Sequence, residues 1–269
     1  MTRIYDKREA MWTVYHDFYL GLDLGKAADH SAVSIVEEPV WLDGEWSATV
    51  TGGVAPGEEP LHGWVSVDRL NIHQHAEARR INLTVTGRPA NPPLRGRYLK
   101  RFPLQTPYRA VVEEVVGMLR SGKLAGADVA VLMDKGNAGT AVQEMFSHIG
   151  VRVIPVLIHG GYQTAYDRYD GTYKVPKRDL VEAAQVALQN RRLEISASLP
   201  DAGILVEELR NFRGTVSEAG HDRYEARERE HDDLVLSLSM AVWFREYCCR
   251  YIEAQMARRS RSFRELGVM

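Results

Sequence analysis

The sequence predicts an α/β protein with a mixed sheet and helices on both faces of that sheet. Residues 18–24 (FYLGLDL) and 31–37 (SAVSIVE) are apolar or β-branched runs of strand length. Between residues 107 and 158, the apolar pattern changes in the order helix, strand, helix, strand. Such alternation places strands in parallel and packs the connecting helices against the sheet.

The alternating segments can be assigned in order. A helix is predicted to begin near Pro107 and to stop by Gly122, because apolar residues recur at helical spacing between them: Val111, Val112, Val115, Val116 and Leu119. Residues 127–133 (ADVAVLM) predict a buried strand, residues 140–149 a helix, and residues 151–158 another strand.

The remaining segments extend this architecture. Residues 176–189 and 202–212 predict two more helices, and residues 215–227 alternate weakly, which favours a hairpin. Residues 234–247 predict a long apolar helix. Residues 40–93 carry strand and turn patterns, and we interpret them as an insertion within the sheet.

Length and composition limit the classes of protein. The 269 residues have a formal net charge of −2 and are 45 % apolar, which suits a globular protein with a large core. These values exclude a disordered chain, a collagen-like repeat, a disulfide scaffold and a small, strongly basic nucleic-acid-binding domain. They leave nucleic-acid binding open, because acids elsewhere can offset a local basic face. We expect a single domain over residues 1–269.

The ends and the cysteines favour a cytosolic protein. The N-terminus has no apolar signal region, and no apolar run approaches the roughly 18 residues that a bilayer requires, so we expect no membrane association. Cys248 and Cys249 are adjacent, which favours packing as small hydrophobic residues in a reducing compartment.

Carboxylates occupy unusual places in three segments. Asp23 lies inside an apolar strand, Asp134 ends a second one, and Asp232 and Asp233 open the last apolar helix. A buried, unpaired carboxylate is costly. Acids from distant segments become favourable together when they share hard divalent cations such as Mg²⁺ or Mn²⁺. Two such ions can activate water and stabilise the leaving oxygen of a phosphodiester.

Each acid also has a purely structural interpretation. Asp23 is also explained as a residue of an edge strand or as the ion-pair partner of an arginine. Asp134, which is followed by Lys-Gly-Asn, is also explained as part of an Asx turn. Asp232 or Asp233 suits a cap for the last helix. The ordered combination of all three segments favours the shared-cation hypothesis over the separate alternatives.

The ordered segments resemble the nuclease domain of the large terminase subunit of tailed bacteriophages, which has a ribonuclease H-like fold. The resemblance is carried by residues 21–36, 131–146, 173–195 and 231–243, in the order that the family has. It implies that Asp23, Asp134 and one or both of Asp232 and Asp233 bind metal; the sequence does not decide between the last two. Asp29 also matches a recurrent family position, or only shapes its loop.

The resemblance implies a function and a setting. It implies a DNA endonuclease that uses two Mg²⁺ or Mn²⁺ ions to hydrolyse double-stranded DNA during packaging, in the cytoplasm of the bacterial host. We expect no ATPase motor in this sequence, since the one phosphate-loop-like segment, residues 117–123, lacks the following Ser or Thr and continues a helix. The alternatives are a stand-alone nuclease-domain protein and a motor that is separated onto another chain. A separate terminase ATPase, the small terminase subunit and the portal are therefore the expected partners.

Basic and aromatic residues suggest auxiliary contacts. Lys177 and Arg178 begin a predicted helix, where they suit DNA phosphate contacts or a solvated helix end. His231 suits metal or water chemistry, or a helix cap. The Arg-rich tail from about residue 250 suits DNA or partner contacts, or a solvated end. Residues 160–171, which are rich in tyrosine, are interpreted as a packed loop, with DNA contact as the alternative.

Three other functions remain open. A Holliday-junction resolvase shares the fold and the acidic set. The GLDLG segment, residues 21–25, also resembles the first phosphate-binding turn of actin-like and sugar-kinase ATPases, although the second loop of those proteins is poorly matched. A catalytically silent packaging subunit is the third alternative. A preference for branched DNA in a panel of substrates distinguishes the resolvase, ATP hydrolysis distinguishes the ATPase, and the lack of cleavage with Mg²⁺ or Mn²⁺ distinguishes the silent subunit.

Overall fold

The computed structural model of the chain describes residues 2–6, 11–15, 18–25, 29–39, 41–47, 49–51, 64–71, 82–85, 88–90, 93–136, 138–216, 222–225 and 231–249. The chain divides into two compact units. The unit formed by residues 18–37 and 94–243 contains all the candidate acids, and residues 1–17, 38–93 and 244–269 form the other. The expectation of one domain over residues 1–269 stays a prediction.

An eight-stranded sheet forms the centre of the first unit, in the order β13-β14-β12-β11-β3-β4-β10-β15. Its strands are β3 (Phe18–Asp23), β4 (Ala32–Glu37), β10 (Leu94–Arg101), β11 (Val129–Asp134), β12 (Ile154–His159), β13 (Ala165–Tyr166), β14 (Tyr173–Pro176) and β15 (Leu193–Ile195).

The strand directions confirm the mixed sheet. Strands β3, β4 and β10 are antiparallel neighbours, whereas β3, β11, β12 and β14 run parallel. This is the arrangement expected of a ribonuclease H-like fold. Because β4 and β10 pair directly, residues 38–93 are an insertion between two neighbouring strands, as predicted.

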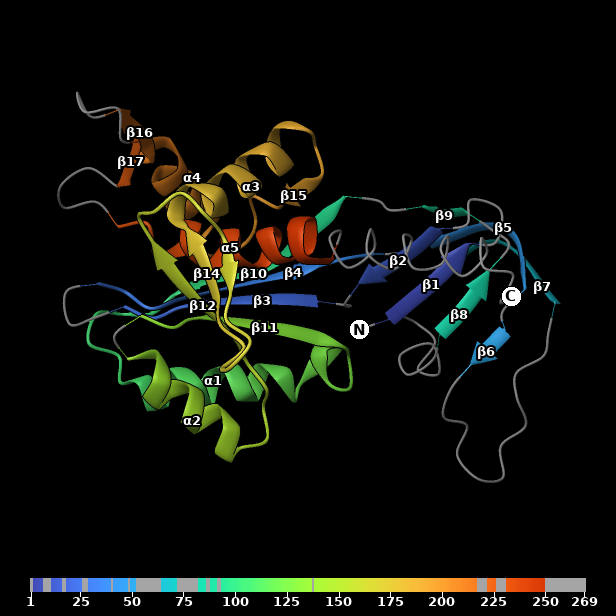
Figure 1. The fold of residues 1–269 in the computed structure, drawn as a ribbon, viewed down its shortest axis with the longest axis horizontal. Coiled ribbons are helices and arrows are strands. Elements are labelled where there is room, and N and C mark those ends of the chain that lie inside the picture. Colours follow the sequence, from blue (N-terminus) through green and yellow to red (C-terminus); the bar gives the residue numbers. More distant parts are fainter. Residues whose placement is uncertain are drawn as a thin grey trace. The chain divides into compact units, whose positions relative to one another are not determined.

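Helices cover both faces of this sheet (Figure 1). On one face lie α1 (Tyr108–Leu119) and α2 (Gly139–His148), and on the other lie α3 (Lys177–Gln189), α4 (Ala202–Asn211) and α5 (Asp233–Trp243). A short 3₁₀ turn, η3 (Gly122–Leu124), follows α1. None of the helices within the described ranges combines the length and the apolarity that a bilayer requires.

The alternation of β3 assigns its side chains to two layers. Leu20 and Leu22 belong to the apolar core that contains Val115 of α1 and Phe146 of α2. Gly21, which lies between them, faces α5. A Cβ atom at Gly21 would lie only 1.8 Å from the carbonyl oxygen of Ser237, so the glycine permits the backbone of α5 to approach the strand closely.

A buried hydroxyl pair fixes α5 on the neighbouring strand. The Oγ atoms of Ser34 in β4 and Ser237 in α5 lie 2.6 Å apart. The Ser237 hydroxyl donates to the carbonyl oxygen of Leu234, so its single proton is used there and Ser34 is the donor in the pair. The last apolar helix is thus held against β3 and β4.

The predicted hairpin and last helix are present with different bounds. The hairpin comprises β16 (Arg213–Val216) and β17 (Asp222–Glu225). The helix predicted over residues 234–247 is α5 only as far as Trp243, and a π-helical turn, η4 (Phe244–Cys249), continues it. Cys249 is buried, as expected of a small hydrophobic residue.

The other unit contains two small sheets. They have the orders β2-β1-β8-β6 and β7-β5-β9. Their strands are β1 (Thr2–Asp6), β2 (Met11–Tyr15), β5 (Trp41–Ser47), β6 (Thr49–Thr51), β7 (Trp64–Asn71), β8 (Asn82–Val85) and β9 (Arg88–Ala90). Within this unit, Glu38 and Arg245 form a buried ion pair. The Arg-rich tail from about residue 250 lies outside the described residues.

Candidate active site

Two of the predicted acids end neighbouring strands. Strands β3 and β11 pair in parallel, and the last residues in register are Leu22 and Met133. Asp23 and Asp134 follow these residues, so they lie side by side at the carboxyl edge of the sheet, the usual place of ligand sites in parallel sheets. The alternation of side chains points both acids toward the face that carries α5.

The first turn of α5 brings the other two acids to this edge. Asp23 is only 7 % exposed. Its pKa is raised well above the ordinary value, first by burial and then by the charges of Asp134, Asp233 and Asp232, in that order. Four carboxylates from three separate elements therefore interact electrostatically around the end of β3.

Asp233 and Asp232 have different surroundings. Asp233 is 5 % exposed, and its Oδ2 atom accepts no hydrogen bond from a described residue. Burial, followed by the charge of Asp232, raises the pKa of Asp233 to about 6. Asp232 is less buried and forms an ion pair with Lys177, whose Nζ lies 2.5 Å from the Asp232 Oδ2. The Oδ2 atoms of both acids are buried without a hydrogen bond in the described ranges, and the ion pair with Lys177 compensates only that of Asp232.

Asp134 combines the two interpretations that the sequence allowed. Its Oδ1 accepts a hydrogen bond from the backbone N–H of Gly136 at 3.2 Å, which is the geometry of an Asx turn. The same side chain is the largest charged contributor to the raised pKa of Asp23. The turn therefore orients Asp134 at the edge of the sheet and does not remove it from the acidic group.

The acidic group has donors of the kind that bind a divalent cation. Among the side chains that the structure describes, no three His, Cys, Asp or Glu residues are arranged to hold a metal ion as they lie. The chemistry of the donors nevertheless fits such an ion, because they are carboxylate oxygens in a partly buried place. Burial, followed by repulsion from the other carboxylates, raises the pKa of Asp23, and a cation among these carboxylates would favour their charged forms.

The predicted auxiliary residues divide into two groups. Lys177 belongs to the acidic group through Asp232, and His231 lies beside it, with Nδ1 3.7 Å from the Asp233 Oδ2. Arg178 instead donates to Asp179 and to the carbonyl oxygen of Tyr162. Asp29 lines a separate pocket of about 190 Å³ with Gly25, Ser31, Pro103, Gln105, Thr106, Pro107 and Tyr108.

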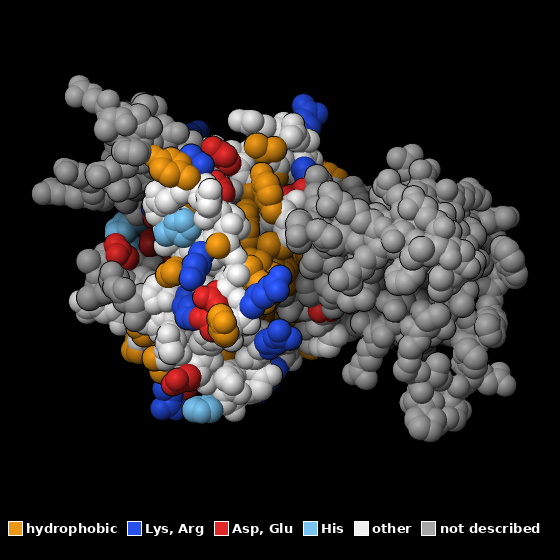
Figure 2. Space-filling model, viewed as in Figure 1, with side chains coloured by type: hydrophobic (Ala, Val, Ile, Leu, Met, Phe, Trp, Pro, Cys, Tyr) orange, Lys and Arg blue, Asp and Glu red, His pale blue; other side chains and the backbone are white. Residues whose placement is uncertain are grey.

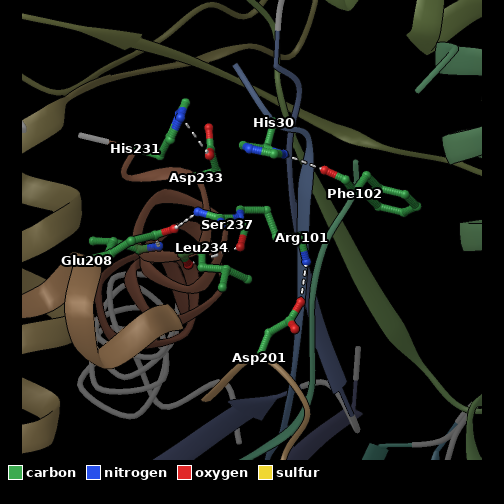
Figure 3. Close-up of polar contacts among 10 residues, drawn as sticks. His30, Arg101, Phe102, Asp201, Glu208, His231, Asp233, Leu234 and Ser237 are labelled. Carbon is green, nitrogen blue, oxygen red and sulfur yellow. Dashed lines mark hydrogen bonds and ion pairs between the residues drawn. The ribbon is translucent and has the colours of Figure 1, made fainter. Parts of the chain in front are cut away.

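Sequence reasoning missed His30. Its Nδ1 lies 2.6 Å from the carbonyl oxygen of Phe102, and since a carbonyl can only accept, Nδ1 carries the proton. The ring points toward Asp233 and meets the ring of His231 edge to face at 4.9 Å (Figure 3). His30 lies in a loop without periodicity, so the sequence contained no signal for this placement.

Sequence reasoning also missed Glu208. It is 5 % exposed on α4, and burial raises its pKa to about 7 against the lowering effect of the Val235 backbone N–H. A signal did exist, because Ala202, Leu205 and Glu208 are spaced three residues apart along one face of a predicted helix. A carboxylate on the same helix face as buried core residues is expected to have a hydrogen-bond or ion-pair partner, because burying it alone is costly.

The tyrosine-rich segment differs from its prediction. Tyr162 and Tyr166 are about half exposed and Tyr169 is fully exposed, so these rings do not form the expected packed loop. The guanidinium of Arg178 lies 4.9 Å from the centre of the Tyr162 ring. Figure 2 shows positive and negative side chains intermingled on this face of the described residues.

Without metal, the protein is expected to lose stability as the pH rises from about 4 to about 7. The folded pKa values of Asp23, Asp233 and Glu208 are raised, whereas unfolded carboxyl groups titrate near 4. The folded state therefore binds more protons in this range, and the free energy of unfolding falls with rising pH. For Asp233, the difference between about 4 and about 6 corresponds to about 3 kcal/mol.

Urea unfolding in EDTA near pH 5 and pH 8 measures this effect. The variant Asp233→Asn lacks the titrating group and should lose less stability between the two pH values than the wild type does. An equal loss in both proteins would show that the Asp233 carboxyl group does not carry the expected linkage.

Comparisons with known proteins give weak likenesses. No protein-family model matches the sequence, and no curated protein matches it. The large terminase nuclease of thermophilic phage G20c, also solved with bound magnesium, is 16 % identical with a TM-score of 0.46, over 90 % of this chain and 91 % of that one. The large terminase nuclease domain of Thermus phage P74-26 is 16 % identical with a TM-score of 0.46, over 84 % and 78 %.

Proposed function

We propose that this chain is a metal-dependent DNA endonuclease of the phage terminase type. One observation carries the proposal: the carboxylates at the ends of β3 and β11 and at the start of α5 converge around a buried Asp23, whose pKa their charges raise. Such repulsion is costly in an isolated protein and useful in one that binds cations. The ordered sequence segments that resemble terminase nucleases agree with this interpretation.

In this proposal Asp23, Asp134 and Asp233 hold two Mg²⁺ or Mn²⁺ ions, with Asp232 as a further ligand or as the partner of Lys177. When bound, the ions supply the positive charge that activates water and stabilises the leaving oxygen of a phosphodiester. Asp23 suits the central position, because it lies between the neighbouring strand and the helix that carry the other acids.

Three cationic or basic side chains complete the site. Lys177 lies at the edge of the acidic group, where its ammonium is suited to a DNA phosphate. His30 has its Nδ1–H fixed by the Phe102 carbonyl, which leaves Nε2 to accept a proton near Asp233. Arg178, the next residue of α3 after Lys177, lies on the Tyr162 ring outside the acidic group and would provide a second phosphate contact.

The proposed setting is DNA packaging in the bacterial host cytoplasm. Double-stranded DNA is the substrate, and a separate terminase ATPase, the small terminase subunit or the portal are the partners. Phosphate contacts of Lys177 and Arg178 are independent of base sequence, so their contribution should weaken as salt rises. This suits a nuclease that is directed to its substrate by a packaging complex.

A plasmid assay tests the proposal. The purified protein with Mn²⁺ should nick or linearise supercoiled plasmid DNA, and EDTA should stop the reaction. Isothermal titration should detect Mn²⁺ binding at the same concentrations. Intact plasmid after long incubation at high protein concentration, together with no Mn²⁺ binding, would instead favour the silent packaging subunit.

The same preparation distinguishes the related activities. A Holliday junction cleaved much faster than linear duplex DNA would indicate a resolvase. Hydrolysis of ATP without DNA cleavage would indicate an ATPase of the actin or sugar-kinase type. We expect cleavage of duplex DNA and no hydrolysis of ATP.

A further inference from the structure

The first turn of α5 has an unusual cap. The backbone N–H of Leu236 donates to the carbonyl oxygen of Asp232 at 2.9 Å, so Asp232 is the N-cap residue of this helix. The side chain of an N-cap aspartate normally accepts from the N–H groups two or three residues farther along. In α5 those groups belong to Leu234 and Val235.

Glu208 of α4 takes these donors instead. Its Oε2 accepts the Val235 N–H at 3.0 Å in a buried hydrogen bond. A backbone hydrogen bond from Leu234 also lowers the pKa of Glu208, which burial raises. A helix start has several N–H groups without intrahelical partners, and here a different helix satisfies them.

Arg101 holds Glu208 in place. The guanidinium Nη1 of Arg101 lies 3.5 Å from the Glu208 Oε1, and the backbone N–H of Arg101 donates to the Asp201 Oδ2 at 2.7 Å. Asp201 immediately precedes α4, so the last residue of β10 contacts the helix at its start and at Glu208 (Figure 3). The cap of α5 is therefore fixed to the central sheet.

The cap by Glu208 affects the surroundings of Asp232 and Asp233. With Glu208 at the cap, the Asp232 carboxylate lies against Lys177. Apart from that ion pair, the Oδ2 atoms of Asp232 and Asp233 are both buried without a hydrogen bond from any group in the described ranges. We infer that Glu208 is a positioning residue, which caps α5 in place of Asp232 and thereby leaves the Asp232 and Asp233 carboxylates in the acidic group, where cations would bind. The link to cations rests on the proposed function.

A double-mutant cycle without metal tests the cap itself. In Glu208→Ala, the Asp232 side chain should turn to the Leu234 and Val235 N–H groups and become the cap. Asp232→Ala should therefore lower the melting temperature in EDTA more in the Glu208→Ala background than in the wild type. Additive effects of the two substitutions would overturn the inference, whether or not the protein binds metal.

Metal affinity tests the consequence. Glu208→Ala should weaken Mn²⁺ binding by roughly 10- to 100-fold, as loss of an outer-shell partner does. Glu208→Gln keeps a carbonyl acceptor for the Val235 N–H and should bind Mn²⁺ within a few-fold of the wild type, which a loss of folding alone would not explain. Glu207→Ala, at the neighbouring exposed position, is the matched control and should change neither readout.

The outcomes separate the two proposals. If the wild-type protein binds no Mn²⁺, the proposed function is contradicted. The double-mutant cycle in EDTA still tests whether Glu208 caps α5, because it needs no metal. Wild-type protein that binds Mn²⁺ with the same affinity as Glu208→Ala would contradict the inference and leave the proposed function intact.

Discussion

Asp23→Asn is expected to abolish DNA cleavage while making the metal-free protein more stable. Asp23 is buried at the centre of the acidic group, and three other carboxylates raise its pKa. An amide of the same shape removes one negative charge and with it the cation-binding capacity of the position. A loss of several kcal/mol of charge stabilisation corresponds to a roughly 1,000-fold or greater decrease in rate.

The gain in stability has the same cause. Near pH 8 the Asp23 carboxyl group of the folded wild-type protein is either ionised among like charges or protonated at a pH far above the pKa of an unfolded aspartate. Both states cost free energy. The amide has neither cost, so the melting temperature in EDTA should rise. The rise should be about 2–4 °C for each kcal/mol that the substitution adds to the free energy of unfolding, the value for a domain of about 150–250 residues. Mn²⁺ should stabilise the wild type and leave the variant unchanged.

Plasmid cleavage and thermal melting, each with Mn²⁺ and with EDTA, measure both effects. Glu113→Gln is the control, because this exposed residue of α1 pairs with Arg109 on the opposite face of the sheet and should affect neither. Full cleavage by Asp23→Asn would refute the assignment of the site. A variant that is inactive and also less stable would show that Asp23 has a structural role.

The position of Asp23 and Asp134 could be predicted from sequence because strand patterns are local. Apolar runs marked the two strands, and each acid occupied the end of its run. The parallel pairing of β3 and β11 then placed the acids side by side. The rule that carboxyl ends of parallel strands form sites needed no knowledge of the side-chain contacts.

The roles of the acids on α5 could not be predicted in the same way. A local rule identifies Asp232 as an N-cap, and the structure agrees with that backbone role. The rule cannot detect that a carboxylate from α4 occupies the cap position, because Glu208 and Val235 are distant in sequence. The ion pair of Lys177 with Asp232 was beyond prediction for the same reason.

The differences in the apolar segments have similar causes. The apolar pattern of residues 234–247 does not distinguish an α-helix from the π-helical turn that follows Trp243, because both bury the same kinds of side chain. The tyrosines of residues 160–171 were expected to pack because large rings usually do, and their exposure became visible only in three dimensions. Local composition thus predicts elements better than their surroundings.

Substitutions of the two adjacent acids are expected to differ strongly in effect. Asp233→Asn should reduce cleavage by roughly 100-fold or more, because it removes the more buried of the two carboxylates, which is only 5 % exposed. Asp232→Asn should cost less than about 10-fold, because its carboxylate is already paired with Lys177. Asp233 also contributes more than Asp232 to the raised pKa of Asp23.

The two variants are matched, since they make the same chemical change one residue apart. Single-turnover cleavage over a range of Mn²⁺ concentrations should show a rate for Asp233→Asn that stays low at saturating metal. Asp232→Asn should approach the wild-type rate and bind DNA somewhat more tightly at low salt, because Lys177 is released for phosphate contacts. The reverse order of effects would transfer the ligand role to Asp232 and make Asp233 the residue that supports it.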